Sequence, residues 1–239
     1  MKRILIVEDE AALAEGLKFN FEQEGYDVLQ AADGPTAIDL VRESDPPIDI
    51  IILDLMLPSM SGYEVCRKVR EFDPAVPILV LSARTLSEDK TLAFESGTDQ
   101  YMTKPFALPE LIARVKNLIE RRPLKQGSPS GQAPQVFKFG DVTVDFLKYQ
   151  LITPNEVYTL TTMEMELMKY FVTHPDVVLS RTRILRDVWE ETADITSRSI
   201  DNFVLRLRRM FEPDPSEPRY LVSIRGTGYR FIPSGNASS

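Results

Sequence analysis

The sequence predicts an α/β doubly wound domain built on a five-stranded parallel sheet, followed by a smaller α+β domain with three helices and a hairpin. Short apolar runs alternate with amphipathic segments through residues 1–122. Residues 123–134 are rich in proline, glycine and serine, which indicates a flexible linker. In residues 135–233, alternating apolar positions give way to helical spacing. Residues 234–239 form a polar tail that we expect to fray.

Composition excludes several classes of protein. Of the 239 residues, 43% are hydrophobic and 27% are charged, which is the balance of a folded, soluble protein. The single cysteine, Cys66, excludes an intramolecular disulfide, and the single histidine, His174, leaves little for a Cys/His metal centre. No apolar run approaches the roughly 18 residues of a membrane span. The segment Met1–Glu10 lacks the long apolar region of a signal peptide, so we expect a cytoplasmic protein with no membrane partner.

Charge is distributed unevenly along the chain. Residues 1–122 contain 14 Lys and Arg and 22 Asp and Glu, a net charge of 14 − 22 = −8. Residues 123–239 contain 14 of each, a net charge of 14 − 14 = 0. Within this neutral half, the segment Arg198–Arg230 holds seven arginines and only four acidic residues. An acidic half and a half with a local arginine cluster indicate two different roles.

The first half contains five strand–helix repeats. The expected strands are Arg3–Val7, Asp27–Gln30, Ile48–Leu53, Ile78–Leu81 and Gln100–Met102. The expected helices cover residues of about 10–24, 35–44, 61–71, 87–96 and 108–121. Repeated βα units imply a parallel sheet with helices on both faces. Residues Ile50–Leu53 are continuously apolar, as expected of a central strand covered on both sides.

The second half begins with strands and continues with helices. Short alternating apolar runs in Val136–Thr161 predict a small antiparallel sheet. Thr161 and Glu164 have the spacing of a capping box, and Ser180 is placed to cap a second helix. The three expected helices run from this box to about residue 173, over about 181–190, and over about 197–211. The segment Tyr220–Ile232 carries a hairpin signal, so this half describes a winged helix-turn-helix.

Polar residues follow the carboxyl ends of four predicted strands. Glu8 and Asp9 follow the first, Asp54 the third, Ser82 the fourth and Lys104 the fifth. Ligands of open α/β sheets bind at this edge. Three converging carboxylates repel one another unless a cation lies among them, and hard oxygen ligands suit Mg²⁺. A lysine and a hydroxyl suit a phosphoryl group, so the set predicts phosphoryl transfer onto Asp54 to form an aspartyl phosphate.

A purely structural interpretation of these residues is also open. Acidic residues after strands are common helix caps, and the segment Glu8–Glu10 alone fits that use. Taken singly, each residue is more often structural than functional. Five such residues at the ends of four strands make the structural interpretation improbable.

Residues 1–122 resemble a bacterial response-regulator receiver domain, a flavodoxin-like form of the doubly wound fold. The motifs that carry the resemblance are Val7–Glu10, Leu53–Pro58 with Ser61–Gly62, Leu81–Ala83 and Tyr101–Phe106. The resemblance implies that Asp54 accepts a phosphoryl group from a sensor histidine kinase. It also implies that Glu8, Asp9, Asp54 and the main-chain carbonyl of Met56 hold Mg²⁺, directly or through water.

The same resemblance assigns roles to the residues around the phosphoryl group. It implies that Lys104 pairs with this group and that Ser82 swings toward it. Tyr101 would rotate inward behind Ser82, although by sequence alone it is an ordinary strand aromatic. The resemblance also implies that the peptide bond between Lys104 and Pro105 is cis.

The third predicted helix of the second half carries a polar stripe. Arg198, Asn202, Arg206 and Arg209 are separated by four, four and three residues, which places them on one helical face. The opposite face is apolar and consists of Ile200, Phe203, Val204 and Leu207. A helix fits the major groove of double-stranded DNA, where Arg binds guanine and Asn binds adenine.

The predicted hairpin supplies two further candidates for DNA contact, Ser223 and Arg225, which would reach phosphate or the minor groove. For an isolated helix or hairpin, arginines on one side are more often a solvated face. The helix-turn-helix followed by a wing favours DNA binding instead.

Residues 136–232 resemble the effector domain of the OmpR/PhoB subfamily. The motifs that carry the resemblance are Leu160–Glu164, Leu179–Arg181, Arg198–Asp201, Leu205–Arg208, Pro218–Tyr220 and Arg225–Phe231. The resemblance implies a transcription factor that binds tandem half-sites as a homodimer when phosphorylated. It also implies that the stretch Trp189–Thr196 can face RNA polymerase, while Trp189 itself is expected in the core.

One feature departs from the subfamily pattern. Active receivers of this type commonly dimerise through the fourth helix, fifth strand and fifth helix, using ion pairs. Lys90 and Glu110 fit one such pair, but the usual acidic partner of Arg114 is replaced by Gln100. Exposed pairs contribute only about 0–1 kcal/mol each. We therefore expect a weakened or reshaped dimer, not the loss of the dimer.

Three functions compete at this point. The first is a phosphorylation-controlled DNA-binding regulator whose DNA affinity falls steeply with salt. The second is a hydrolase of the haloacid-dehalogenase type, which needs an acid two residues after its nucleophile; Met56 occupies that position and argues against an enzyme. The third is a regulator whose DNA binding does not depend on phosphorylation. The complete set of carboxylates argues against it.

Overall fold

The computed structural model describes residues 1–121, 135–189 and 197–235. The chain divides into two compact units, Met1–Arg122 and Pro123–Ser239, and each is described by itself. The predicted linker and nearly all of the loop predicted to face RNA polymerase lie outside the described residues. Among the helices that are described, none has the length and apolar character needed to cross a membrane.

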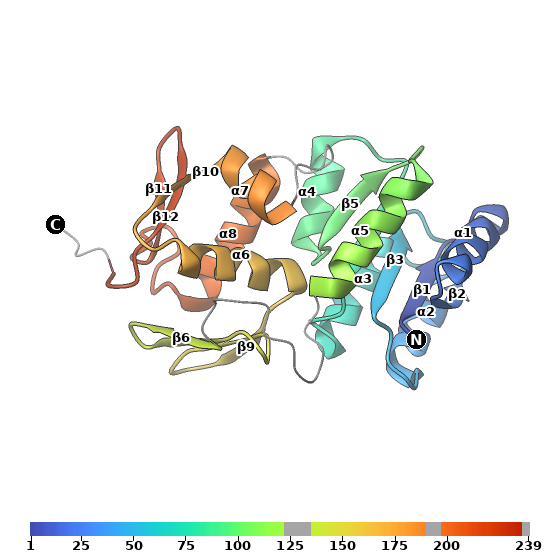
Figure 1. The fold of residues 1–239 in the computed structure, drawn as a ribbon, viewed down its shortest axis with the longest axis horizontal. Helices are drawn as coiled ribbons and strands as arrows, with labels where there is room; N and C mark the ends of the chain where they lie inside the picture. Colours follow the sequence, from blue (N-terminus) through green and yellow to red (C-terminus); the bar gives the residue numbers. More distant parts are fainter. Residues whose placement is uncertain (122–134, 190–196, 236–239) are drawn as a thin grey trace. The chain divides into compact units, whose positions relative to one another are not determined.

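The first unit consists of five strands and five helices that alternate along the chain (Figure 1). The strands are β1 (Arg3–Val7), β2 (Asp27–Ala31), β3 (Ile50–Asp54), β4 (Ile78–Ser82) and β5 (Gln100–Thr103). The helices are α1 (Ala11–Gln23), α2 (Gly34–Glu43), α3 (Gly62–Phe72), α4 (Ser87–Glu95) and α5 (Leu108–Arg121). Each begins and ends within two residues of its predicted boundary.

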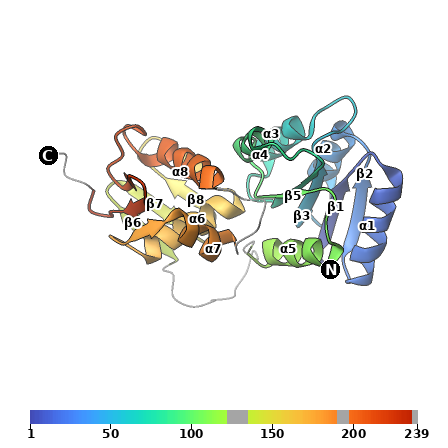
Figure 2. The same ribbon diagram turned by 90° about the horizontal axis from the view of Figure 1, so that it is seen from above.

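The five strands form one parallel sheet in the order β2-β1-β3-β4-β5. Helices α1 and α5 cover one face, and α2, α3 and α4 cover the other (Figure 2). The predicted doubly wound fold is therefore confirmed. Because all strands run in the same direction, their carboxyl ends lie along one edge of the sheet.

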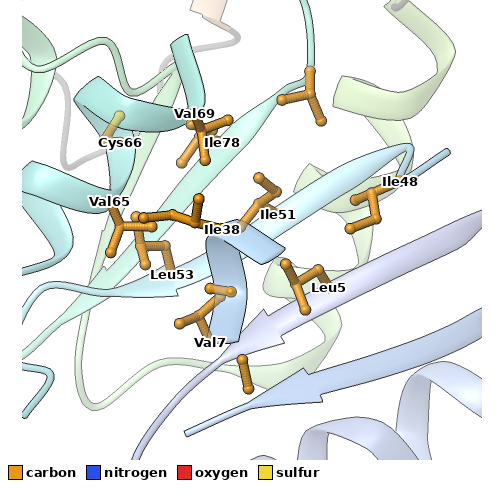
Figure 3. Close-up of a cluster of buried hydrophobic side chains, with 13 residues drawn as sticks. Leu5, Val7, Ile38, Ile48, Ile51, Leu53, Val65, Cys66, Val69 and Ile78 are labelled. Atoms are coloured by element: carbon orange, nitrogen blue, oxygen red, sulfur yellow. The ribbon is translucent and has the colours of Figure 1, made fainter. Parts of the chain in front are cut away.

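The core of this unit holds the sheet rigid. Strands β3 and β4 are buried over their whole length, since helices cover both faces. Between the sheet and helices α2 and α3, Ile51 and Leu53 pack with Ile38 and Val65 (Figure 3). Burial of each such side chain contributes about 1.5–3 kcal/mol. The strand ends are thus held in fixed positions for the residues that follow them.

Helix α3 begins directly beside the end of β3. Its first residue, Gly62, donates its N–H to the carbonyl of Leu55 at 3.0 Å. A Cβ atom at this position would lie 2.3 Å from the carbonyl oxygen of Asp54, so only glycine fits. Ser61 and Glu64 form a capping box that starts the helix. The segment after Asp54 is therefore held in place by the end of β3 and by the start of α3.

The described residues of the second unit, 135–189 and 197–235, form two small sheets and three helices. The strands are β6 (Val136–Phe139), β7 (Val142–Asp145), β8 (Gln150–Ile152), β9 (Val157–Thr159), β10 (Val178–Ser180), β11 (Leu221–Ile224) and β12 (Gly228–Phe231). The helices are α6 (Thr162–Thr173), α7 (Arg181–Trp189) and α8 (Ser197–Phe211). Strands β6 to β9 form an antiparallel sheet in chain order, and a second sheet has the order β10-β12-β11. The predicted sheet, three helices and hairpin are confirmed.

Strand β10 was not predicted. It has three residues, of which only Leu179 is fully buried, and it pairs antiparallel with β12. A three-residue strand is too short to carry an alternating pattern, and it forms because the distant hairpin supplies its partner. Ser180, at its end, accepts a hydrogen bond from the N–H of Arg183 at 3.1 Å, as predicted for a helix cap.

Aromatic residues form much of the core of the second unit. Phe139 lies edge-on to Phe211, Tyr220 and Phe231, with ring centroids 5.0–5.3 Å apart. Trp189 is buried and packs on Phe203 of α8 at 5.1 Å, as expected for a core residue. These contacts tie the first sheet, the last helix and the hairpin into one body.

Candidate functional site

Three carboxylates converge at the carboxyl edge of the parallel sheet. Asp54 ends β3, and Glu8 and Asp9 follow β1. One oxygen from each lies within 4.8 Å of the other two. Glu8 and Asp54 are only 4% and 6% exposed, while Asp9 is exposed. The structure therefore brings these predicted residues together into one acidic pocket.

Lys104 enters this pocket from the end of β5. Its Nζ donates hydrogen bonds to Oδ2 of Asp54 at 2.5 Å and to Oε2 of Glu8 at 2.7 Å. Burial raises the pKa of Glu8, and the contact with Lys104 offsets this only in part. Burial alone would lower the pKa of Lys104, but its two carboxylate partners raise it overall, so the ammonium stays charged. The bond between Lys104 and Pro105 is cis, as the family resemblance implied.

The donor set fits a divalent cation. The three carboxylates and the one ammonium sum to −3 + 1 = −2, which a divalent ion would neutralise. All the acidic ligands are hard oxygen donors, as Mg²⁺ prefers. The other oxygen of Asp54, Oδ1, accepts the N–H of Met56 at 2.8 Å, and the Met56 side chain is exposed beside the pocket.

Ser82 and Tyr101 meet at the main chain of Arg84. Ser82 ends β4, is fully buried, and accepts the N–H of Arg84 at its Oγ atom at 3.2 Å. Tyr101 is also fully buried, and its hydroxyl donates to the Arg84 carbonyl at 2.7 Å. The Arg84 guanidinium pairs with Asp89 of α4 at 2.7 Å. Sequence reasoning missed Arg84, because main-chain contacts carry no residue signature.

The residues predicted for dimerisation lie close to Tyr101. Lys90 Nζ is 5.6 Å from the centroid of the Tyr101 ring. Arg114 is buried, and its Nη2 lies 2.5 Å from Oε1 of Glu110 on the same helix. Arg114 Nη1 donates to the Tyr101 carbonyl at 3.2 Å. Glu110 thus supplies, within one chain, an acidic partner that Gln100 does not provide.

The polar stripe of α8 divides into exposed and internally paired residues. The apolar face is buried as predicted, at Ile200, Phe203, Val204 and Leu207. Arg209 is exposed and Asn202 is half-buried. Arg206 instead lies with its Nη2 2.6 Å from Oε1 of Glu164, a buried carboxylate of α6. Arg198 belongs to α8, but its side chain lies outside the described part of the structure.

The two hairpin residues predicted to contact DNA also include one exposed residue and one residue that is paired within the domain. Arg225 is exposed at the turn between β11 and β12. Ser223 is exposed, but its Oγ accepts a hydrogen bond from Arg208 at 2.8 Å. Arg208 also donates to the carbonyl of Leu221 at 2.8 Å, so this arginine joins α8 to β11.

Two further acidic residues fasten α8 to the hairpin. Asp201 accepts hydrogen bonds from the hydroxyl of Tyr229 at 2.5 Å and from Nε of Arg181 at 2.7 Å. Burial and then the contact with Asp201 raise the pKa of Tyr229 to about 12, so it remains a hydrogen-bond donor. Glu212, at the end of α8, is buried and accepts three main-chain N–H groups, those of residues 219–221. Helix and wing are therefore presented as one rigid surface.

Comparison with known proteins agrees with this architecture. Residues 4–116 match the family described as response regulator receiver domain. Residues 155–231 match the family described as transcriptional regulatory protein, C terminal. The solved structure of a RitR mutant is 25% identical, with 97% of this chain and 99% of that chain covered and a TM-score of 0.74. The response regulator DrrB, described as an OmpR/PhoB homologue of Thermotoga maritima, is 28% identical over 97% of this chain and 99% of its own, with a TM-score of 0.50.

A receiver unit followed by a DNA-binding unit defines a transcription regulator of the phosphorylation-regulated class. The chain belongs to the response regulators, with a receiver domain followed by a winged-helix domain of the OmpR/PhoB type.

Proposed function

We propose that a sensor histidine kinase phosphorylates Asp54 in the presence of Mg²⁺, and that this modification promotes homodimerisation and DNA binding. The observation that carries the proposal is the position of Asp54: its carboxylate is buried at the end of β3, and the Lys104 ammonium bridges it to Glu8. A carboxylate used only as a helix cap would not need a half-buried ammonium and two further acids around it.

The chemistry follows from the contacts of Asp54. One carboxylate oxygen attacks phosphorus, the bond to the donor's leaving group breaks, and an acyl phosphate forms. Lys104 neutralises charge on the transferred group. Mg²⁺, held by Glu8, Asp9, Asp54 and the carbonyl of Met56, would supply further charge neutralisation. The Ser82 hydroxyl accepts one N–H and retains its own proton, which it would donate to a phosphoryl oxygen.

The proposed output is binding to double-stranded DNA. Helix α8 would enter the major groove, with Arg198, Asn202, Arg206 and Arg209 on the face toward the bases and Ser223 and Arg225 at the wing. Dimerisation through the region of Lys90, Glu110 and Arg114 would hold two such domains on neighbouring half-sites. Linked domains bind more tightly because the second contact occurs at a high effective concentration. RNA polymerase is a further proposed partner.

Replacing Arg209 or Arg225 with Ala is expected to weaken binding to any duplex. Each exposed guanidinium that contacts a phosphate releases about one counterion, so each variant should reduce the slope of log K against log salt by about 1. Fluorescence anisotropy over a salt series measures this slope. Arg67→Ala, an exposed arginine of the receiver, is the control and should leave it unchanged. An unchanged slope with altered base preference would instead assign these arginines to base contacts.

Phosphorylation is expected to tighten DNA binding by roughly 5- to 150-fold, the usual range for coupling between two sites. The probe is the duplex that the wild-type chain enriches from a random pool. Its affinity is measured before and after incubation with Mg²⁺ and acetyl phosphate. Asp54→Asn should not respond to the phosphodonor. Equal binding by both proteins under all conditions would contradict the proposal and support a regulator that ignores phosphorylation.

A further inference from the structure

Glu164 makes a different contact with each of its two carboxylate oxygens. It lies in the first turn of α6 and is 1% exposed. Its Oε2 accepts the N–H of Thr161 at 2.8 Å, which completes the capping box of α6. Its Oε1 lies 2.6 Å from Nη2 of Arg206 on α8. The residue that starts α6 therefore also holds a side chain of the proposed recognition helix.

Separating Glu164 from Arg206 costs free energy. Removing one partner of a buried ion pair leaves an uncompensated charge in a medium of low dielectric constant, which is strongly destabilising. If Arg206 turned toward a DNA phosphate, Glu164 would be left buried without its counter-charge. The 22% exposure of the Arg206 side chain means that part of it still reaches the outer surface of α8.

Arg206 also shares a helical face with Asn202 and Arg209. Arg209 is exposed and has its full charge available for phosphate contacts. The charge of Arg206 is balanced by Glu164 before any DNA arrives. The two arginines therefore differ in their expected contacts with DNA. Arg209 attracts any duplex, whereas Arg206 presents a guanidinium in a fixed position with little net charge.

We propose that Glu164 is a positioning residue for DNA recognition, which holds Arg206 in one orientation and cancels its charge, so that Arg206 contributes to sequence discrimination and not to general attraction. This inference rests on the proposed DNA-binding function. It assigns a recognition role to a residue that does not itself face the DNA.

The test is Glu164→Gln in the full chain. The Gln carbonyl still accepts the Thr161 N–H, so the cap is kept, but the ion pair is lost and the charge of Arg206 is no longer balanced by Glu164. Two probes are used: the duplex enriched by the wild-type chain from a random pool, and a shuffled duplex of the same composition. Discrimination between them is expected to fall roughly tenfold. The slope of log K against log salt should steepen by about 1, because one more cation contacts phosphate.

The double variant Glu164→Gln with Arg206→Gln provides a second, independent readout. It leaves no buried charge unpaired, so it is expected to fold even if the single variant does not. Its salt slope should return to the wild-type value while discrimination stays low. Glu166→Gln removes the same charge from the same helix and should change neither quantity.

The outcomes separate this inference from the proposed function. A wild-type chain that does not distinguish the two duplexes would count against the DNA-binding function itself. Wild-type discrimination retained in Glu164→Gln, or in the double variant, would overturn the role of Glu164. A parallel loss of affinity for both duplexes, with unchanged discrimination and salt slope, would reduce Glu164 to a purely structural residue.

Discussion

Asp54→Asn is expected to abolish phosphoryl uptake from acetyl phosphate. Asn is nearly identical in shape to Asp and still accepts the N–H of Met56, but its amide is not nucleophilic and carries no charge. Intact-mass analysis after incubation with Mg²⁺ should find one added phosphoryl group on the wild-type chain and none on the variant. EDTA should prevent uptake by the wild-type chain, because the acidic pocket would then lose its divalent ion.

Asp49→Asn is the matched control for this experiment. Asp49 precedes β3 and Asp54 ends it, so the two carboxylates are separated by the length of the strand, about 16 Å at 3.3 Å per residue. Asp49 pairs with Lys2 outside the acidic pocket, and its replacement should leave uptake intact. Phosphorylation of Asp54→Asn to the wild-type level would show that another residue is the acceptor. No uptake by the wild-type chain would shift the proposal to an acceptor served only by a kinase.

Arg70→Met is expected to destabilise the receiver by about 3–5 kcal/mol, the cost of leaving one member of a buried ion pair without its partner. The Nη2 atom of Arg70 lies 2.8 Å from Oδ2 of Asp99, which is fully buried. Arg70 also donates hydrogen bonds to the carbonyls of Val76 and Gly97, at 2.5 and 2.9 Å. Arg70 also donates to the carbonyl of Asp73 at 3.3 Å, so loss of this side chain removes the counter-charge of Asp99 and the donor to three carbonyls at once.

The position of the only tryptophan allows the unfolding of the two domains to be followed separately. Trp189 lies in α7 of the second unit, so its fluorescence follows the DNA-binding domain. Far-UV circular dichroism during urea unfolding should report an earlier receiver transition in Arg70→Met, while the Trp189 transition stays in place. Lys68→Met, at an exposed position of the same helix, should change stability by no more than about 0.5 kcal/mol. A loss below about 1 kcal/mol in Arg70→Met would mean that water or a neighbouring group replaces the guanidinium.

Periodicity accounts for the success of the fold prediction. Apolar runs separated by helical segments require a parallel sheet, and a parallel sheet brings the ends of its strands to one edge. Glu8, Asp54 and Lys104 are distant in the sequence, yet their shared position after strands was sufficient to predict that they converge. The acidic pocket could therefore be predicted from the sequence without any knowledge of side-chain contacts.

The same reasoning was less complete for the second unit. Helical spacing correctly separated the apolar face of α8 from its polar stripe. It could not reveal that Arg206 lies beside Glu164, because the partner comes from another helix and was assigned only to a cap. Strand β10 and the contact of Ser223 with Arg208 were missed for the same reason. Each depends on a neighbour brought close by folding.

The sequence by itself therefore determined the fold class, membership in the response regulators and the set of residues at the carboxyl edge. These follow from local periodicity and from motifs whose residues are close together in the chain. Only the tertiary structure decided which charges are neutralised internally by a distant residue: Arg70 by Asp99 and Arg206 by Glu164. An ion pair depends on the distance between two side chains and on their burial, and folding sets both.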